Sequence, residues 1–151
     1  MNFTPNRINA FNFFKLPSVW WCGIRVTKID DVSCQVKVVH RWINQNPFKS
    51  MFWAVQGMAA ELTTGALIME AIHNSNRKVS MLVLNNRANF SKKARGKVLF
   101  ECDEKQKLIK SMNTLIKTQE PQTIWLTSKG IDQNGDIVST FEFEWTLLLK
   151  N

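Results

Sequence analysis

The chain has 151 residues, of which 44% are hydrophobic, with 10 phenylalanines, 6 tryptophans and no tyrosine. This composition is typical of a globular protein with its own core, and it excludes a disordered or fibrous chain. The formal net charge of +8 is compatible with an anionic partner. No linker-like stretch or repeat divides the sequence, so we expect one domain over residues 1–151, in which residues 1–22 form an N-terminal helix and lead-in.

The cysteines and histidines argue against disulfides and metal binding. Cys22, Cys34 and Cys102 are odd in number and widely spaced, which favours reduced thiols in the cytoplasm. His40 and His73 have no other histidine or cysteine within four residues. We therefore expect no metal site and a cytoplasmic protein.

Neither a secretory signal nor a membrane span is expected. Lys15 interrupts the apolar part of the N-terminus, so no signal-peptide core follows. The stretch 51–72 is long enough to cross a bilayer, but it contains Glu61 and Glu70. An acid at the centre of such a helix costs about 2.5–3.5 kcal/mol even on a lenient insertion scale.

The N-terminal third of the chain predicts a helix followed by a hairpin. An amphipathic helix is expected over residues 3–15, anchored by Phe3, Ile8, Phe11 and Phe14. Strands over 23–29 and 32–41 flank a tight turn at Asp30 and Asp31. The second strand alternates like a half-buried strand, with Val32, Cys34, Val36 and Val38 turned inward.

A long apolar helix over about residues 48–73 comes next. It is followed by a long strand over 79–90 with a break or bulge at Asn85–Asn86. A basic turn at 91–96 and a strand over 97–102 complete this part.

The last third of the chain predicts a helix and a second hairpin. Asp103 and Gln106 resemble a capping box at the start of the helix. The solvent face of this helix carries Lys105, Lys107, Lys110 and Lys117. Strands over 123–130 and 137–149 flank an Asn-Gly turn. The final strand alternates, with Phe141, Phe143, Trp145 and Leu147 on one face.

The long helix carries one carboxylate, Glu61, near its middle. The helix is apolar nearly all round, so other structure must surround it. Gly57 and Gly65 lie one turn to either side of Glu61 on the same stripe. Each glycine costs about 1 kcal/mol relative to alanine, so we expect something to approach the helix closely there. Glu61 then has either a structural partner or a place at a wet cleft, and both interpretations stay open.

The order of elements predicts an α+β fold in which a curved antiparallel sheet of about six strands wraps one central helix. Three further pieces of the sequence are informative: Asn46 with Phe52-Trp53-Ala54 and Glu61, the segment Asn89 to Lys97, and Phe143-Glu144-Trp145. In their order and spacing they resemble the hotdog fold and its acyl-CoA thioesterase superfamily, closest to a thioesterase-like branch catalogued as a domain of unknown function. The resemblance covers roughly residues 20–149.

This resemblance implies thioester hydrolysis. Glu61 would be the base or the nucleophile, and Asn46 would hydrogen-bond the water or the carbonyl. Backbone N–H groups of Phe52 and Trp53 would hold the oxyanion, and apolar residues would line an acyl tunnel. Phe52 stands where related enzymes have histidine, and Trp53 and Ala54 stand where they have glycine, which leaves the activity open.

The basic cluster of Lys92, Lys93, Arg95 and Lys97 has two interpretations. It could bind the phosphates of coenzyme A, or it could be a solvated turn. Coenzyme A would enter as part of the substrate, and we expect no separate cofactor. The expected partners are an acyl-CoA or another acyl thioester, and a second copy of the chain in a homodimer or dimer of dimers.

Two alternatives to the thioesterase remain. One is an acyl- or acyl-CoA-binding protein without turnover on the same fold. The other is a basic protein of nucleic acid or membrane surfaces, which the core-like placement of most aromatics disfavours. We therefore expect no nucleic acid as partner. A hotdog dehydratase is disfavoured because Asn46 occupies the position where that relative has a histidine.

Overall fold

The computed structural model describes residues 3–150, so that the ends of the expected domain, residues 1–2 and 151, lie outside the described part. In chain order the elements are α1 (Pro5–Lys15), α2 (Pro17–Trp21), β1 (Arg25–Ile29), β2 (Cys34–Val39), a 3-10 turn η1 (Trp42–Asn44), α3 (Trp53–Ser75), β3 (Val79–Phe90), β4 (Lys97–Cys102), α4 (Lys105–Thr118), β5 (Gln122–Asp132) and β6 (Ile137–Leu149).

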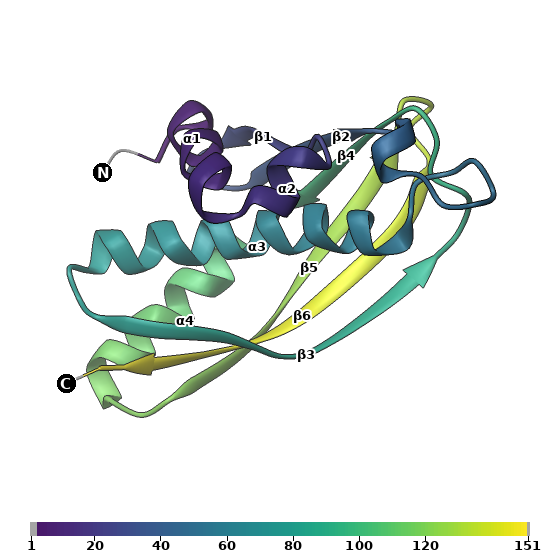
Figure 1. Ribbon diagram of the computed structural model, residues 1–151. Helices are drawn as coiled ribbons and strands as arrows, with labels where there is room; N and C mark the ends of the chain where they lie inside the picture. The colour runs from purple at the N-terminus through teal and green to yellow at the C-terminus, as the bar shows by residue number, and fades with distance from the viewer. Residues whose placement is uncertain (1–2, 151) are drawn as a thin grey trace.

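The six strands form one antiparallel sheet in the order β1-β2-β4-β5-β6-β3. The sheet curves around α3, and α1 and α2 lie on the other side of this helix from β3 and β6 (Figure 1). Between Val83 and Asn85 the β3–β6 register shifts, close to the bulge expected at Asn85–Asn86. The predicted α+β architecture, a curved sheet around one long helix, is confirmed.

The hydrophobic core lies between α3 and the concave side of the sheet. Strand β6 alternates as predicted, so that its inward side chains are all buried: Phe141, Phe143, Trp145 and Leu147. On α3 the fully buried residues include Ala59, Ala60, Leu67 and Ile68. Burial of this apolar surface at about 25 cal/mol per Å² is the main force that holds the helix against the sheet.

Helix α3 begins at Trp53, later than the expected start at residue 48. The preceding segment is held as a loop by backbone bonds to other parts of the chain. The N–H of Met51 donates to the carbonyl of Ala94 at 2.8 Å, and the N–H of Phe52 donates to the carbonyl of Asn44 at 2.9 Å. These donors are therefore engaged outside the helix, although the apolar spacing continues through them.

Helix α1 turns an unexpected face to the core. Ile8 and Asn12, one turn apart, are its buried residues. Phe14 is 75% exposed and Phe11 is 37% exposed, so the prediction that they anchor the helix is wrong for Phe14 and only partly met by Phe11.

The side chain of Asn9 fixes α1 to the outer edge of β1. Its Nδ2 donates to the carbonyl of Val26 at 2.9 Å, and its Oδ1 accepts from the N–H of Val26 at 2.9 Å. The amide therefore reproduces one residue of a pairing strand, and it satisfies backbone groups that an edge strand would otherwise leave open.

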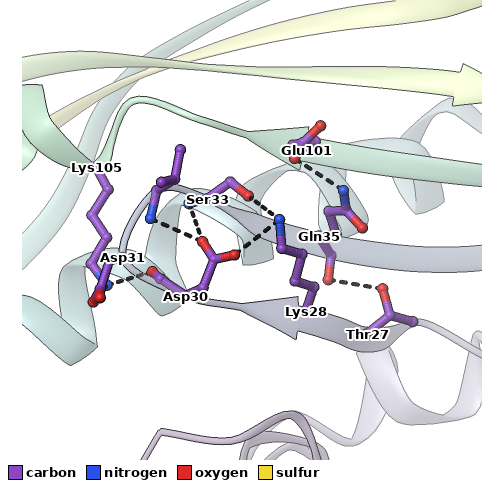
Figure 2. Close-up of polar contacts among 9 residues, drawn as sticks. Thr27, Lys28, Asp30, Asp31, Ser33, Gln35, Glu101 and Lys105 are labelled. Carbon is purple, nitrogen blue, oxygen red and sulfur yellow. Dashed lines mark hydrogen bonds and ion pairs between the residues drawn. The ribbon is translucent and has the colours of Figure 1, made fainter.

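The turn between β1 and β2 is built around Asp30, and α4 begins beside it (Figure 2). The Asp30 carboxylate accepts from the N–H groups of Val32 and Ser33 and pairs with Lys28 at 2.9 Å. Val32 thus belongs to the turn and is 58% exposed, so its expected inward place in a strand is wrong.

Lys105, expected on the solvent face of α4, is buried. Its Nζ lies 2.7 Å from the Glu70 carboxylate on α3 and donates to the carbonyl of Asp30 at 2.5 Å. A buried lysine needs such partners because an unpaired charge in the interior is strongly unfavourable. This one ammonium group joins α3, α4 and the β1–β2 turn.

The capping box expected from Asp103 and Gln106 is not formed. The N-cap residue of α4 is Glu104, and no side chain caps the helix. The Glu104 carboxylate instead accepts from the N–H of Thr127 on β5 at 2.6 Å. A tertiary hydrogen bond has therefore replaced the local one.

Candidate active site

Glu61 lies in the third turn of α3 and lines a mostly apolar cavity of about 80 Å³. A water molecule needs about 10–15 Å³ on this measure, so the cavity has room for several. Its other lining residues come from the N-terminal segment, α1, α3 and β3: Phe3, Ile8, Phe11, Asn12, Leu16, Leu62, Gly65, Ala66, Met69 and Met81. Helix α1 therefore covers the carboxylate.

The surroundings of Glu61 favour its neutral form. No described residue donates a hydrogen bond to its carboxylate, and no lysine or arginine lines the cavity. Burial raises the pKa of the Glu61 carboxyl group above its ordinary value, because a charge in apolar surroundings loses its hydration. A carboxylate with a raised pKa is the better proton acceptor near neutral pH.

The expectation that other structure approaches the helix closely at the two glycines beside Glu61 is not met at Gly57, and at Gly65 the close atom belongs to Glu61 itself. A Cβ atom at Gly57 would lie 3.4 Å from Cε1 of Phe141. A Cβ atom at Gly65 would lie 3.3 Å from Oε1 of Glu61 and 3.8 Å from the Trp145 ring. Gly57 therefore has space for a methyl group, whereas Gly65 makes room for the Glu61 carboxylate.

In a single copy of the chain, Asn46 does not line the Glu61 cavity. It lines a separate surface hollow at the start of α3. Its Oδ1 accepts from the N–H groups of Phe48 and Ser50, at 2.9 and 3.3 Å, and its Nδ2 donates to the Ser50 hydroxyl at 3.0 Å. In one chain Asn46 therefore shapes the loop before α3 and does not share a cavity with Glu61.

The start of α3 borders the second hollow, which Phe52 and Trp53 line. The N–H of Phe52 already donates to Asn44, so it is not free to hold an oxyanion. Within residues 3–150, the N–H groups of Trp53 and Ala54 donate to no other residue, as is usual for the first turn of a helix. Trp53 and Ala54 are thus the amide pair that could receive negative charge.

The basic residues divide into engaged and exposed ones. Lys92 lies 2.8 Å from both Asp132 and Asp136, in the turn between β5 and β6. These carboxylates raise the pKa of Lys92 and neutralise its charge locally. Lys93, Arg95 and Lys97 are exposed, and the Lys93 ammonium lies 6.0 Å from the Phe48 ring centre.

Two polar residues of these hollows were missed by sequence reasoning. Asn12 lines the Glu61 cavity, is 1% exposed, and its Nδ2 has no hydrogen-bond acceptor among the described residues. Gln56 lines the second hollow and is also buried, and its Oε1 has no donor there. For Asn12 a signal was available, because it lies four residues after Ile8 on the inward face of α1.

Two further features bear on function. In the described part of the chain, no helix is long and apolar enough to cross a membrane. Over the same residues, no three histidine, cysteine or acidic side chains come together as metal ligands would. Among the described residues that line the Glu61 cavity, the polar side chains are those of Glu61 and Asn12.

Comparison with known proteins identifies the family. Residues 5–147 match the model described as Domain of unknown function (DUF4442), and no curated protein is similar in sequence. Among solved structures, a Pseudomonas aeruginosa protein of unknown function, described as a thioesterase candidate, is 17% identical over 97% of both chains with a TM-score of 0.82. A Shewanella oneidensis thioesterase candidate is 11% identical, covering 95% of this chain and 96% of its own, with a TM-score of 0.81.

A Haemophilus influenzae thioesterase is 12% identical, covering 99% of this chain and 93% of its own, with a TM-score of 0.74. Identities this low show a shared fold and not a shared reaction. The chain belongs to the DUF4442 family, and its fold is the hotdog fold of thioesterase-like proteins.

Proposed function

We propose that the protein hydrolyses an acyl thioester and that Glu61 is the base. The observation that carries this proposal is a single carboxylate in a mostly apolar cavity, with a raised pKa and no cation beside it. The apolar walls suit an acyl chain, and the carboxylate suits activation of a water molecule. The fold that the protein shares with thioesterases supports thioester hydrolysis in general, but it does not say which residues carry out the reaction.

The reaction needs one proton acceptor and one site for negative charge. Glu61 takes a proton from water while the water oxygen bonds to the thioester carbonyl carbon, which leaves a negative charge on the carbonyl oxygen. When the carbonyl double bond forms again, the carbon–sulfur bond breaks, and the leaving thiolate receives the proton that Glu61 took from water. The products are a carboxylic acid and a thiol, and the carboxylate is restored.

A second route uses Glu61 as nucleophile. Its oxygen would attack the carbonyl carbon and expel the thiolate, and water would then hydrolyse the resulting anhydride. A single turnover in ¹⁸O-labelled water can identify this route. Label in the Glu61 carboxylate would establish the nucleophile, because it requires an anhydride that water opens at the glutamyl carbon. Label in the product acid alone is expected if Glu61 is the base, and also if water opens the anhydride at the acyl carbon.

We further propose that the working unit is a two-fold dimer joined along β3. Strand β3 is a sheet edge, and its side chains include exposed Leu82, Leu84 and Phe90. A long apolar edge of this kind favours pairing with another strand. The Glu61 cavity includes Met81 near the start of β3, and the second hollow includes Phe90 at its end.

The two-fold axis of this dimer would bring the Glu61 cavity of one subunit close to the second hollow of the other. When two antiparallel copies of β3 pair about their midpoints, the start of one lies opposite the end of the other. The Glu61 cavity of one subunit then adjoins the partner's second hollow, with its Asn46 and the Trp53 end of α3. Residues that lie apart in one chain would in this way form one site between subunits.

The thiol half of the substrate is proposed to be coenzyme A. Lys93, Arg95 and Lys97 remain exposed for its phosphates, whereas Lys92 is engaged by Asp132 and Asp136. Three free cysteines, two of them buried, suit a reducing compartment such as the cytoplasm.

The test is thiol release from a panel of acyl-CoAs by the wild type, by Glu61→Gln and by Glu120→Gln. Glu120 is exposed in the connection after α4 and serves as the matched control. Loss of a general base should lower turnover by about 100-fold or more in Glu61→Gln and leave Glu120→Gln unchanged. Full turnover in Glu61→Gln would reject the catalytic assignment.

Binding without turnover is the second candidate. It is favoured by the bulk of Trp53 and Ala54 at the start of α3, where a glycine would let a ligand approach the backbone closely. Calorimetry would then show saturable acyl-CoA binding by a wild type that releases no thiol from any member of the panel.

A further inference from the structure

The side chain of Asn12 is a buried amide with an unused donor. It is 1% exposed, and its Nδ2 finds no acceptor among the described residues. A buried polar group left unpaired destabilises the folded state, because it loses its hydrogen bonds to water without replacing them. The same side chain lines the cavity that contains Glu61, and no hydrogen bond joins the two in the described structure.

Stability does not explain an amide at this place. The inward face of α1 presents Ile8 and Asn12, while Phe13 and Phe14 on the outward face are 44% and 75% exposed. An apolar side chain at position 12 would bury more apolar surface and would leave no donor unpaired. The amide is therefore a cost to the fold, which is typical of a residue kept for binding or chemistry.

The neighbouring turn of α1 holds this amide in place. Asn9 is joined to Val26 on β1 by two hydrogen bonds of 2.9 Å, and Pro5 lies in the first turn after the N-cap Thr4. Because the helix that carries this donor is fixed, only the side-chain torsions of Asn12 have to change for Nδ2, which has almost no accessible surface, to reach a substrate atom in the cavity.

We infer that Asn12 is a further catalytic residue, whose Nδ2 donates a hydrogen bond to the carbonyl oxygen of the thioester while Glu61 deprotonates the attacking water. This inference rests on the proposed hydrolysis. Asn12 transfers no proton, and its bond strengthens as negative charge develops on the oxygen. It adds a side-chain donor from the same chain as Glu61.

The test uses Asn12→Leu, which has nearly the same shape and removes the donor, and Asn12→Ala, which cannot clash. Asn6→Leu, at an exposed position of the same helix, is the control. Loss of one oxyanion donor should lower kcat about 100-fold or more. KM should rise by about tenfold at most, because the bond to the carbonyl oxygen is already made in the bound substrate, and the melting temperature should be equal to or above that of the wild type. Asn6→Leu should keep full turnover.

Two unreactive analogues give a readout that does not depend on turnover. In the ketone a CH₂ group replaces the sulfur and the carbonyl remains, and in the thioether a CH₂ group replaces the carbonyl. Asn12→Leu should bind the ketone at least about tenfold more weakly than the wild type does, a loss that corresponds to one hydrogen bond. Its affinity for the thioether should be unchanged.

The outcomes separate this inference from the proposed function. Full turnover in Asn12→Leu, or equal effects on both analogues, would overturn the role of Asn12 while hydrolysis stands. Failure of both Asn12 variants to fold would overturn it too, because the amide would then hold the structure. A wild type that neither releases thiol nor binds either analogue would reject the proposed function itself.

Discussion

Gly65→Ala should separate the stability of α3 from the working of Glu61. The new methyl carbon would lie 3.3 Å from Oε1 of Glu61, a tight contact that is relieved when the carboxylate moves by a few tenths of an ångström. The cavity beside Glu61 leaves room for that movement. Gly57→Ala is the matched control, since its methyl group would make an ordinary contact at 3.4 Å with Phe141.

The expected magnitudes follow from these contacts. Alanine in a helix interior is favoured over glycine by about 1 kcal/mol, which corresponds to a melting temperature about 2–4 °C higher for a protein of this size. Gly57→Ala should show this gain in full, and Gly65→Ala should show part of it. Because a misplacement of about 1 Å can cost about 100-fold in rate, the smaller shift of Glu61 should lower turnover by about tenfold.

The assay pairs thermal unfolding with thiol release from the best acyl-CoA of the panel. Gly57→Ala should keep wild-type turnover, and Gly65→Ala should lose turnover without losing stability. Equal turnover in the two variants would refute the reasoning that Gly65 keeps space for the carboxylate. A Gly65→Ala protein that is less stable than the wild type would show that Glu61 cannot move into the cavity.

Three further predictions concern charge. Burial raises the pKa of Glu61, so the folded state binds this proton more tightly than the unfolded state does. The stability of the protein therefore falls as the pH rises from the ordinary pKa of glutamate through the pKa of Glu61 in the folded state. Glu61→Gln removes this loss and should raise the melting temperature, measured by calorimetry, more at about pH 7.5 than at about pH 4. Lys105→Met leaves Glu70 unpaired and should cost about 3–5 kcal/mol in denaturant unfolding, and a cost below about 1 kcal/mol would show that water replaces the ammonium group. Lys93→Glu with Arg95→Glu should raise KM for an acyl-CoA in a salt-dependent way and leave kcat and a short thioester without nucleotide unaffected; equal losses on both substrates would make the turn structural.

The proposed dimer is tested by sedimentation at micromolar concentration. Leu82→Glu with Leu84→Glu, on the exposed part of β3, should shift the wild-type dimer to monomer. Val32→Glu, at an equally exposed position in the β1–β2 turn, should not. A monomeric wild type would leave the Glu61 cavity and the start of α3 as separate hollows and would remove the shared site.

The strands could be predicted because their signal is local. In β6 a two-residue alternation places every second side chain on the core face, and the Asn-Gly turn fixes where the hairpin reverses. The start of α3 could not be read in this way. Phe48, Met51 and Phe52 continue the helical spacing, but backbone bonds to Asn44 and Ala94 hold them in a loop, and no local pattern encodes those partners.

Buried polar residues were the other limit. Lys105 stands in a lysine-rich helix whose later lysines face solvent, so the local sequence predicts that Lys105 is exposed. Only the tertiary fold brings Glu70 beside it as a partner. Glu61 was found because a carboxylate between two glycines on an apolar helix is unusual. Asn12 was overlooked because the phenylalanines around it suggested a different inward face for α1.

The Asn9 side chain that lies along β1 has a consequence for how copies of this protein can add to one another. At the β1 end of the sheet, a side-chain amide occupies the place of a further strand, whereas at the β3 end no strand among residues 3–150 follows. A sheet with one blocked end and one open end can be extended in one direction only. In the proposed dimer, where two open ends meet, growth along the strand-pairing direction would therefore stop at two copies and would not continue into a fibre.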